Sequence, residues 1–192
     1  MDLRHRGLWI LSAPIGAGKT TFCRALVDAA RSAGASVGGL LSPAIFAEGT
    51  KTGIAVERLS LGETRPLAGL TRTSERDLVI GKRWFFDADV MAWSAEEFER
   101  TPACDLFVVD ELGPLEFALA QGWVGAFAAL QTRAYRDGLV VIRPDLVGEA
   151  RRRLPVTGVV DVPTRAALAG PLAWLNRIAS EVDERRMTND EG

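Results

Sequence analysis

Short apolar runs alternate with longer amphipathic segments along most of the chain. The apolar runs predict strands at residues 7–12, 36–41, 106–109, 139–142 and 156–162, because each has the length of a buried strand. Segments with helical periodicity lie between them and predict helices at 19–33, 95–99, 122–136, 146–153 and 172–186. Strands that alternate with helices predict an α/β protein, with a mainly parallel sheet and helices on both faces.

A few residues predict where these elements begin and end. Gly34 is expected to stop the first long helix, because glycine accepts the positive φ that follows many helices. Ser94 with Glu97 three residues later matches a capping box and predicts a helix start at this serine. Asp137 and Gly138 predict a turn that leads into the strand at 139–142.

The pattern changes between residues 43 and 87. Residues 52–60 alternate between apolar and polar side chains, and residues 83–87 form a short aromatic segment. Alternation with a period of two is typical of a strand with one exposed face. This region therefore predicts an antiparallel extension of the sheet, at about residues 50–87.

Length and composition predict one globular domain. The chain has 192 residues, 47% hydrophobic and 25% charged, which excludes bulk disorder. We expect a single domain over residues 1–187 and a frayed polar tail at 188–192. The net charge of −2 argues against a protein that binds nucleic acid through a large basic surface.

Cysteine and histidine are too scarce for a disulfide framework or a zinc site. The chain contains two cysteines, Cys23 and Cys104, and a single histidine, His5, so we expect both thiols to be small core residues. No apolar run approaches the length of a membrane span or of a signal peptide. These features predict a cytoplasmic protein.

A phosphate-binding loop is predicted between the first strand and the first helix. The segment matches the P-loop pattern except that alanine replaces the first glycine; its residues are Ala13, Pro14, Ile15, Gly16, Ala17, Gly18, Lys19 and Thr20. Gly16 and Gly18 allow backbone N–H groups to wrap an anion, and the following helix adds its positive N-terminal dipole. Lys19 is expected at the β and γ phosphates, Thr20 at Mg²⁺, and Thr21 at another phosphate.

An acidic pair follows the predicted central strand. Asp110 and Glu111 come directly after the apolar run 106–109. In a parallel sheet this strand end shares an edge with the loop after the first strand. We therefore expect Asp110 to hold Mg²⁺ together with Thr20, and Glu111 to orient and deprotonate a water molecule at the γ-phosphate.

Two further charged residues are weighed near this edge. Glu116 is either a third site carboxylate or a solvated loop charge, and Gly113 with Pro114 predicts the turn before it. Arg143 follows the predicted strand at 139–142, so it is either a phosphate sensor or one half of a surface ion pair. Trp84 is a core residue or a platform on which a nucleobase stacks.

The acidic segment resembles a family signature. Residues 109–117 are similar to the Asp-Glu-Ile-Gly-x-Met-Glu signature of the small P-loop nucleoside-triphosphatases, and residues 13–21 resemble the phosphate loop of that family. The order and spacing of the motifs extend the match over about residues 8–178. Ala13, Ile15, Leu112, Leu115 and Lys51 depart from the usual residues of the family.

The resemblance implies a fold, an activity and site residues. It implies a three-layer P-loop NTPase fold and Mg²⁺-dependent hydrolysis of several nucleoside triphosphates with little base selectivity. It places phosphate binding at Gly16, Gly18, Lys19, Thr20 and Thr21, and the acidic signature at Asp110, Glu111 and Glu116.

Two other functions remain open from the sequence. A small kinase would pass the γ-phosphate to a nucleoside, a metabolite or an RNA end, with residues 43–87 forming the acceptor pocket. A nucleotide-dependent switch would bind a protein partner and turn over slowly. Phosphate release without an acceptor favours a hydrolase, whereas release that requires a protein partner favours a switch.

Overall fold

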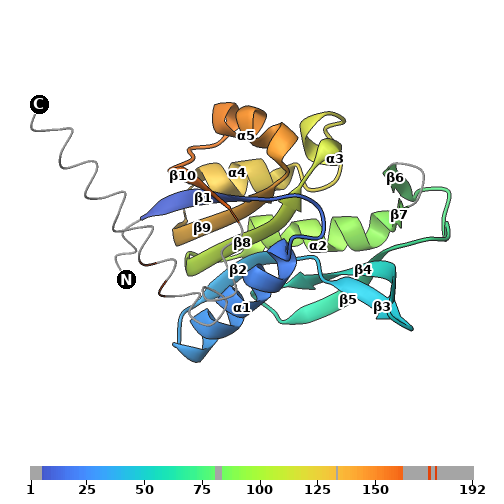
Figure 1. Ribbon diagram of the computed structural model, residues 1–192, viewed down its shortest axis with the longest axis horizontal. Helices are drawn as coiled ribbons and strands as arrows, with labels where there is room; N and C mark the ends of the chain where they lie inside the picture. The colour runs from blue at the N-terminus through green and yellow to red at the C-terminus, as the bar shows by residue number, and fades with distance from the viewer. Residues whose placement is uncertain (1–5, 81–83, 133, 162–172, 174–175, 177–192) are drawn as a thin grey trace, which may run out of the picture.

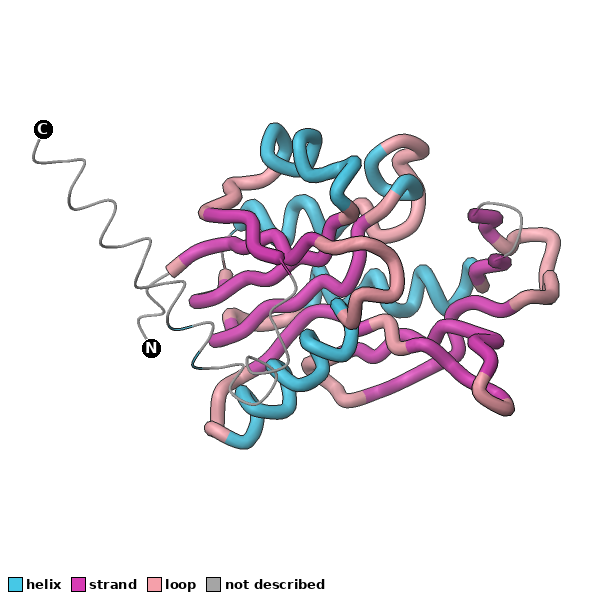
Figure 2. Tube along the Cα trace, in the orientation of Figure 1, coloured by secondary structure: helices cyan, strands magenta, loops and turns pink. Residues whose placement is uncertain are grey.

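One mixed β-sheet runs through the protein and carries helices on both faces (Figures 1 and 2). The computed structural model describes residues 6–80, 84–132, 134–161, 173 and 176. The strands follow the order β10 (Gly158–Asp161), β1 (Gly7–Ser12), β9 (Tyr135–Ile142), β8 (Cys104–Leu112), β2 (Val37–Leu41), β4 (Thr50–Arg58), β5 (Glu63–Gly69), β7 (Trp84–Phe86) and β6 (Leu78–Ile80). A further strand, β3 (Ala44–Ala47), pairs with β4.

The sheet has a parallel half and an antiparallel half. Strands β10, β1, β9, β8 and β2 pair in parallel, whereas β2 pairs with β4, and β4 with β3 and β5, in antiparallel register. The antiparallel pairs continue through β7 and β6. The prediction of a parallel sheet with an antiparallel extension at about residues 50–87 is confirmed.

The helices form the two outer layers. On one face lies α1 (Lys19–Ser32), and on the other lie α2 (Ala88–Arg100), α4 (Gly125–Thr132) and α5 (Val147–Arg153). A short helix α3 (Pro114–Phe117) and a 3-10 turn η1 (Pro144–Leu146) complete the described elements. Each face of the sheet has its own hydrophobic core, and successive residues of β8 face opposite cores. Val108 packs in the core on the α1 side and Val109 in the core on the other side, and both are fully buried.

The first long helix ends where its sequence predicted. Residue Ala33 caps α1, and Gly34 follows it with φ of +77°. The N–H groups of Gly34 and Ala35 donate to carbonyls of the last helical turn at 3.0 and 2.9 Å. The two cysteines are also confirmed as core residues, since neither is more than 2% exposed.

The helix predicted to begin at Ser94 begins seven residues earlier. Asp87 caps α2, and its carboxylate accepts hydrogen bonds from the N–H groups of Asp89 and Val90. Ser94 is instead fully buried within the helix, where its hydroxyl accepts a hydrogen bond from Trp123 Nε1 at 2.9 Å. The capping-box prediction is wrong because its serine binds a side chain from another element.

Glu97, the other half of that predicted box, joins α2 to the sheet. Its buried carboxylate accepts hydrogen bonds from Gly39 N, Ser60 N and Ser60 Oγ at 3.2, 2.8 and 2.7 Å. Arg58, which is 4% exposed, lies 3.4 Å away and supplies the opposite charge. A buried carboxylate needs such partners, because its charge is otherwise too costly to bury.

The turn predicted at Asp137 and Gly138 lies inside β9, so the preceding helix ends at Thr132 as α4. Asp137 is fully buried and pairs with Arg6 and Arg136. A Cβ at Gly138 would lie 2.6 Å from the Tyr135 ring, so glycine is needed here for packing and not for a turn. Ion pairing and packing thus allow turn-forming residues within a strand.

The remaining predictions meet the structure only in part. The helix predicted at 146–153 is confirmed as α5, and β10 lies within the strand predicted at 156–162. The predicted tail, and the helix at 172–186 apart from residues 173 and 176, lie outside the described residues. Within the part that is described, no helix has the length and apolar character needed to cross a membrane.

Candidate active site

The predicted phosphate loop forms the turn between β1 and α1. Gly16 and Gly18 adopt φ of +81° and +86°, which is the left-handed region that side chains disfavour. Gly18 occupies the N-cap of α1, no side chain caps the helix, and its first turn carries no acidic residue. The first-turn amides therefore face the loop without a competing carboxylate, as an anion site requires.

Lys19 folds back over this loop. Its ammonium donates hydrogen bonds to the carbonyls of Ala13 and Pro14, both at 2.8 Å, and the residue is 8% exposed. The backbone thus holds a full positive charge against the mouth of the loop. Ile15, at the tip of the loop, is 84% exposed.

The acidic pair lies in an irregularity of β8. The register between β8 and β9 shifts between Val109 and Leu112, so Asp110 and Glu111 fall within a bulge. Glu111 adopts φ of +78°, an unusual value for a residue other than glycine. A bulge redirects side chains at the end of a strand, and here it leaves Asp110 2% exposed while the Glu111 side chain is 48% exposed.

Asp110 is the buried member of the pair and meets the phosphate loop. Its carboxylate accepts a hydrogen bond from the Ser42 N–H at 3.0 Å, and the Thr20 hydroxyl lies close enough to lower its pKa. Burial, with a smaller contribution from the charge of Glu111, raises the pKa of Asp110 to about 6, although the Ser42 N–H, the Thr20 hydroxyl and Lys19 lower it. The structure thus brings together the two distant motifs that the sequence predicted would meet.

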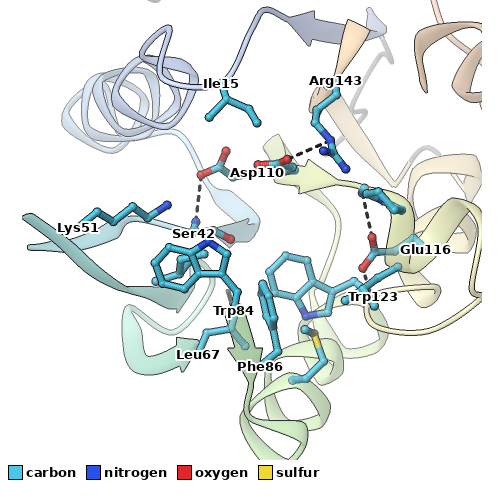
Figure 3. A pocket seen from close by; sticks show the side chains of 16 residues that line it. Ile15, Ser42, Lys51, Leu67, Trp84, Phe86, Asp110, Glu116, Trp123 and Arg143 are labelled. Atoms are coloured by element: carbon cyan, nitrogen blue, oxygen red, sulfur yellow. Dashed lines mark hydrogen bonds and ion pairs between the residues drawn. The ribbon is translucent and has the colours of Figure 1, made fainter. Parts of the chain in front are cut away.

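Glu111 lies beside Arg143, at the end of β9. The Glu111 carboxylate and Arg143 Nε are 3.6 Å apart (Figure 3). The Arg143 side chain is 25% exposed, and its Nε is buried without a hydrogen-bond partner among the described residues. Arg143 is therefore both an ion-pair partner, as one interpretation predicted, and a cation next to the candidate base.

Glu116 is buried and organises the turn after β8. Its two carboxylate oxygens accept hydrogen bonds from the N–H groups of Gly113 and Trp123, each at 2.9 Å (Figure 3). Burial raises the pKa of Glu116, while these two backbone donors lower it. The solvated-charge interpretation is wrong, since the residue is 4% exposed.

A pocket extends from these carboxylates toward the antiparallel half of the sheet. Its volume is about 250 Å³, and the predicted residues Ile15, Asp110, Glu111, Gly113, Glu116 and Arg143 line it. Ser42, Trp84 and several apolar residues also line it (Figure 3). Of these, Trp84 was weighed from the sequence as a stacking residue, whereas Ser42 was not predicted to be a site residue.

Lys51 lies at this pocket over the Trp84 ring. Its ammonium is 5.1 Å from the ring centroid, within the range of a cation–π contact. Lys51 comes from β4 and Trp84 from β7, so the antiparallel extension brings a second cation to the pocket. The resemblance had marked Lys51 only as a departure from the usual arginine.

A protein-family model matches the region that contains both the predicted phosphate loop and the acidic pair. Residues 9–122 match the family model described as NTPase. The chain is 30% identical to "Nucleoside-triphosphatase THEP1" of Methanosarcina acetivorans over 112 residues, 58% of this chain and 62% of that protein. It is 28% identical to the protein of the same name from Methanosarcina barkeri over 163 residues, 82% of this chain and 90% of the relative.

Two solved structures are similar in fold. A solution structure of a human cancer-related nucleoside triphosphatase matches with a TM-score of 0.62 and 22% identity, covering 88% of this chain and 96% of the other. The crystal structure of THEP1 from the hyperthermophile Aquifex aeolicus matches with a TM-score of 0.59 and 18% identity, covering 88% and 98%. The match to the first archaeal relative spans only about three fifths of its length. The family model matches more than half of the residues of this chain. The chain therefore belongs to the THEP1-like NTPase family of P-loop proteins.

Proposed function

We propose that this protein hydrolyses nucleoside 5′-triphosphates to diphosphate and phosphate, with Mg²⁺ and little selectivity for the base. The observation that carries the proposal is that the phosphate loop and the acidic strand end meet at one pocket, which Ile15 of the loop lines together with Asp110 and Glu111. Membership of the NTPase family supports the reaction class.

The loop and its helix bind the β and γ phosphates in this proposal. The amides around Gly16 and Gly18 face the anion, and the N-terminal dipole of α1 adds about half a positive charge. Lys19 moves from the Ala13 and Pro14 carbonyls to the phosphate oxygens, exchanging neutral acceptors for charged ones. Thr21, in the first turn of α1, reaches a further phosphate.

The residues around Asp110 fit Mg²⁺. Asp110 is almost fully buried, and no basic side chain among the described residues forms an ion pair with it. The neighbouring Ser42 Oγ is buried and has no hydrogen-bond partner among the described residues. No described group of three or more metal-binding side chains occurs, which suits Mg²⁺, because this ion takes few protein ligands and completes its shell with phosphates and water.

Thr20 and Asp110 would hold this ion, and it would neutralise charge on the phosphates when bound. The Ser42 N–H donates a hydrogen bond to one oxygen of the Asp110 carboxylate, and this bond fixes the orientation of the carboxylate. Asp110 is thus placed by two backbone segments, β8 and the end of β2. This support is of the kind that metal-ligating carboxylates require.

Glu111 acts as the general base. It accepts a proton from water as the water oxygen bonds to the γ-phosphorus and the bond to the diphosphate oxygen breaks. Arg143 beside it stabilises the charge of the transferring phosphoryl group. Glu116 acts as a positioning residue, because it holds the Gly113 N–H next to the base.

A phosphate-release assay over a panel of ATP, GTP, CTP and UTP, with and without Mg²⁺, tests this function. We expect release from all four with rates within about tenfold, and loss of release when Mg²⁺ is removed. No release from any nucleotide in plain buffer would contradict a hydrolase. Release that appears only with a protein partner would favour a nucleotide-dependent switch.

A further inference from the structure

The pocket beyond the carboxylates has a feature that hydrolysis does not require. Its inner part is a chamber with apolar walls from both halves of the fold, formed by Ile54, Leu67, Trp84, Phe86, Met91 and Trp123. The Trp123 ring is held in place, because its Nε1 donates to the buried Ser94 hydroxyl. We refer to these six residues as the aromatic chamber.

The aromatic chamber lies on the side of Asp110 away from the phosphate loop. Figure 3 shows Ile15 of the loop on one side of Asp110, and Trp84, Leu67 and Phe86 on the other. The strand order agrees, since β8 lies between β1, which leads into the loop, and β4, β5 and β7, which supply chamber walls. A triphosphate held in the loop with its γ-phosphate at Asp110 and Glu111 would therefore have the chamber beyond that phosphate.

The chamber thus lies where a nucleophile approaches the γ-phosphorus, and it is larger than water needs. A water molecule occupies about 30 Å³, whereas an apolar protein cavity of about 150 Å³ binds benzene. The whole pocket, from the carboxylates and Arg143 to the aromatic chamber, measures about 250 Å³, which is several times the volume of a water molecule and of the size that holds one ring. An apolar wall also does little to orient water, which needs hydrogen-bonding partners.

Polar groups are concentrated at the boundary between chamber and phosphates. Glu111 lines the pocket there, and the buried Ser42 Oγ has no hydrogen-bond partner among the described residues. Lys51 adds a positive charge at the Trp84 wall. A ligand with an apolar ring and one hydroxyl group matches this distribution, with the ring in the chamber and the hydroxyl at Glu111.

We propose that the aromatic chamber binds a phosphoryl acceptor, a small alcohol that carries one aromatic ring, and that the protein transfers the γ-phosphate to it. The acceptor oxygen bonds to the γ-phosphorus, the bond to the diphosphate oxygen breaks, and the hydroxyl proton passes to Glu111. This inference rests on the proposed function, because the same loop and base act in both. Water is then the nucleophile that reacts when the chamber holds no alcohol.

The test uses the full chain, ATP with Mg²⁺, and 2-phenylethanol as the acceptor probe. Its methyl ether has the same ring but no hydroxyl and serves as the matched ligand. We expect ³¹P NMR to show a phosphate monoester with the alcohol and none with the ether. Both ligands should change the tryptophan fluorescence without raising KM for ATP.

Three results would overturn the inference. The first is that neither ligand changes the tryptophan fluorescence. The second is that the fluorescence change reaches saturation with the alcohol but no monoester forms. The third is that KM for ATP rises in proportion to the concentration of either ligand. The last result would assign the chamber to the nucleobase. All three leave phosphate release in plain buffer intact, whereas failure of the proposed function would abolish that release.

A pair of variants tests the location. Trp84→Ala removes one wall of the chamber, and Phe46→Ala removes an aromatic ring that is 64% exposed on β3, outside the lining of the pocket. Calorimetric titration of the ether should give a Kd about tenfold higher for Trp84→Ala, as expected for loss of an aromatic contact, and an unchanged Kd for Phe46→Ala. Equal Kd values in the two variants would refute the chamber as the binding site.

Discussion

The backbone of Glu111 allows its strain and its chemistry to be tested separately. At ordinary backbone angles in a strand, alanine is more stable than glycine by about 0.5–1 kcal/mol. At the Glu111 φ of +78° the order should reverse, because a Cβ in the left-handed region costs about 1–2 kcal/mol. We therefore expect Glu111→Gly to be more stable than Glu111→Ala by about 0.5–1 kcal/mol.

Urea unfolding followed by circular dichroism measures this difference, with a common slope for the two variants. Glu63, an exposed residue at the start of β5 without a positive φ, provides the matched control. There Ala should be more stable than Gly. If alanine is as stable as glycine at position 111, the argument from strain is refuted.

Both variants also test Glu111 as the base. Each removes the carboxylate, so turnover should fall about 10²- to 10⁴-fold, which corresponds to about 3–5.5 kcal/mol in the barrier. Nucleotide affinity should be retained, as it should in Glu111→Gln, because the loop and Lys19 bind the phosphates. Phosphate release at saturating ATP is the assay, and turnover close to wild type in all three variants would exclude Glu111 as the base.

Other predictions concern binding, stability and ionisation. Lys19→Ala should raise the Kd for ATP about 10- to 100-fold, since hydrogen bonds to charged groups contribute about 1.5–3 kcal/mol; an unchanged Kd by calorimetry would count against the loop assignment. Glu97→Ala should lower the free energy of unfolding by about 3–5 kcal/mol, because Arg58 loses its buried partner and keeps only the more exposed Glu96. The exposed Glu99→Ala should change it by less than about 0.5 kcal/mol in urea titrations. Burial raises the pKa of Cys104 to about 11, so a thiol reagent at pH 8 should modify it only after unfolding, and rapid labelling of native protein would contradict this. Hydrogen bonds from Ser36 hold the pKa of Asp105 below its usual value. The stability that they provide should therefore be complete above the unfolded pKa of about 4 and should be lost as the pH falls through the folded pKa. In thermal unfolding, the difference in Tm between Asp105→Asn and wild type should be smaller at pH 2 than at pH 7.

Much of the fold was predictable where one segment carries its own signal. The strands around Val108 and Val109 are apolar on both faces, which requires helices on both sides. Gly34 marked the end of α1 because its conformation depends on its own backbone. These predictions depend on a few neighbouring residues and on no distant partner.

The errors arose where a distant partner overrode a local signal. Ser94 and Glu97 match a helix start, yet Trp123 and Arg58 bury them within α2. Asp137 is a residue type that favours turns, but ion pairs with Arg6 and Arg136 stabilise it inside β9. A capping motif or a turn residue indicates what a segment can form when it is exposed, and these segments are not exposed.

For the candidate site, the sequence by itself determined the conformation of the predicted phosphate loop and the place of the acidic pair at the edge of the sheet. Gly16 and Gly18 impose the loop through their own φ angles, and an apolar strand that ends in two acids places them at one edge of a parallel sheet. Only the tertiary structure decided the roles of Ser42, Trp84 and Arg143 around Glu111, because they come from strands or strand ends far apart in the chain. Contacts between such segments depend on how the whole sheet packs against the helices on its two faces, and no local pattern of residues predicts that packing.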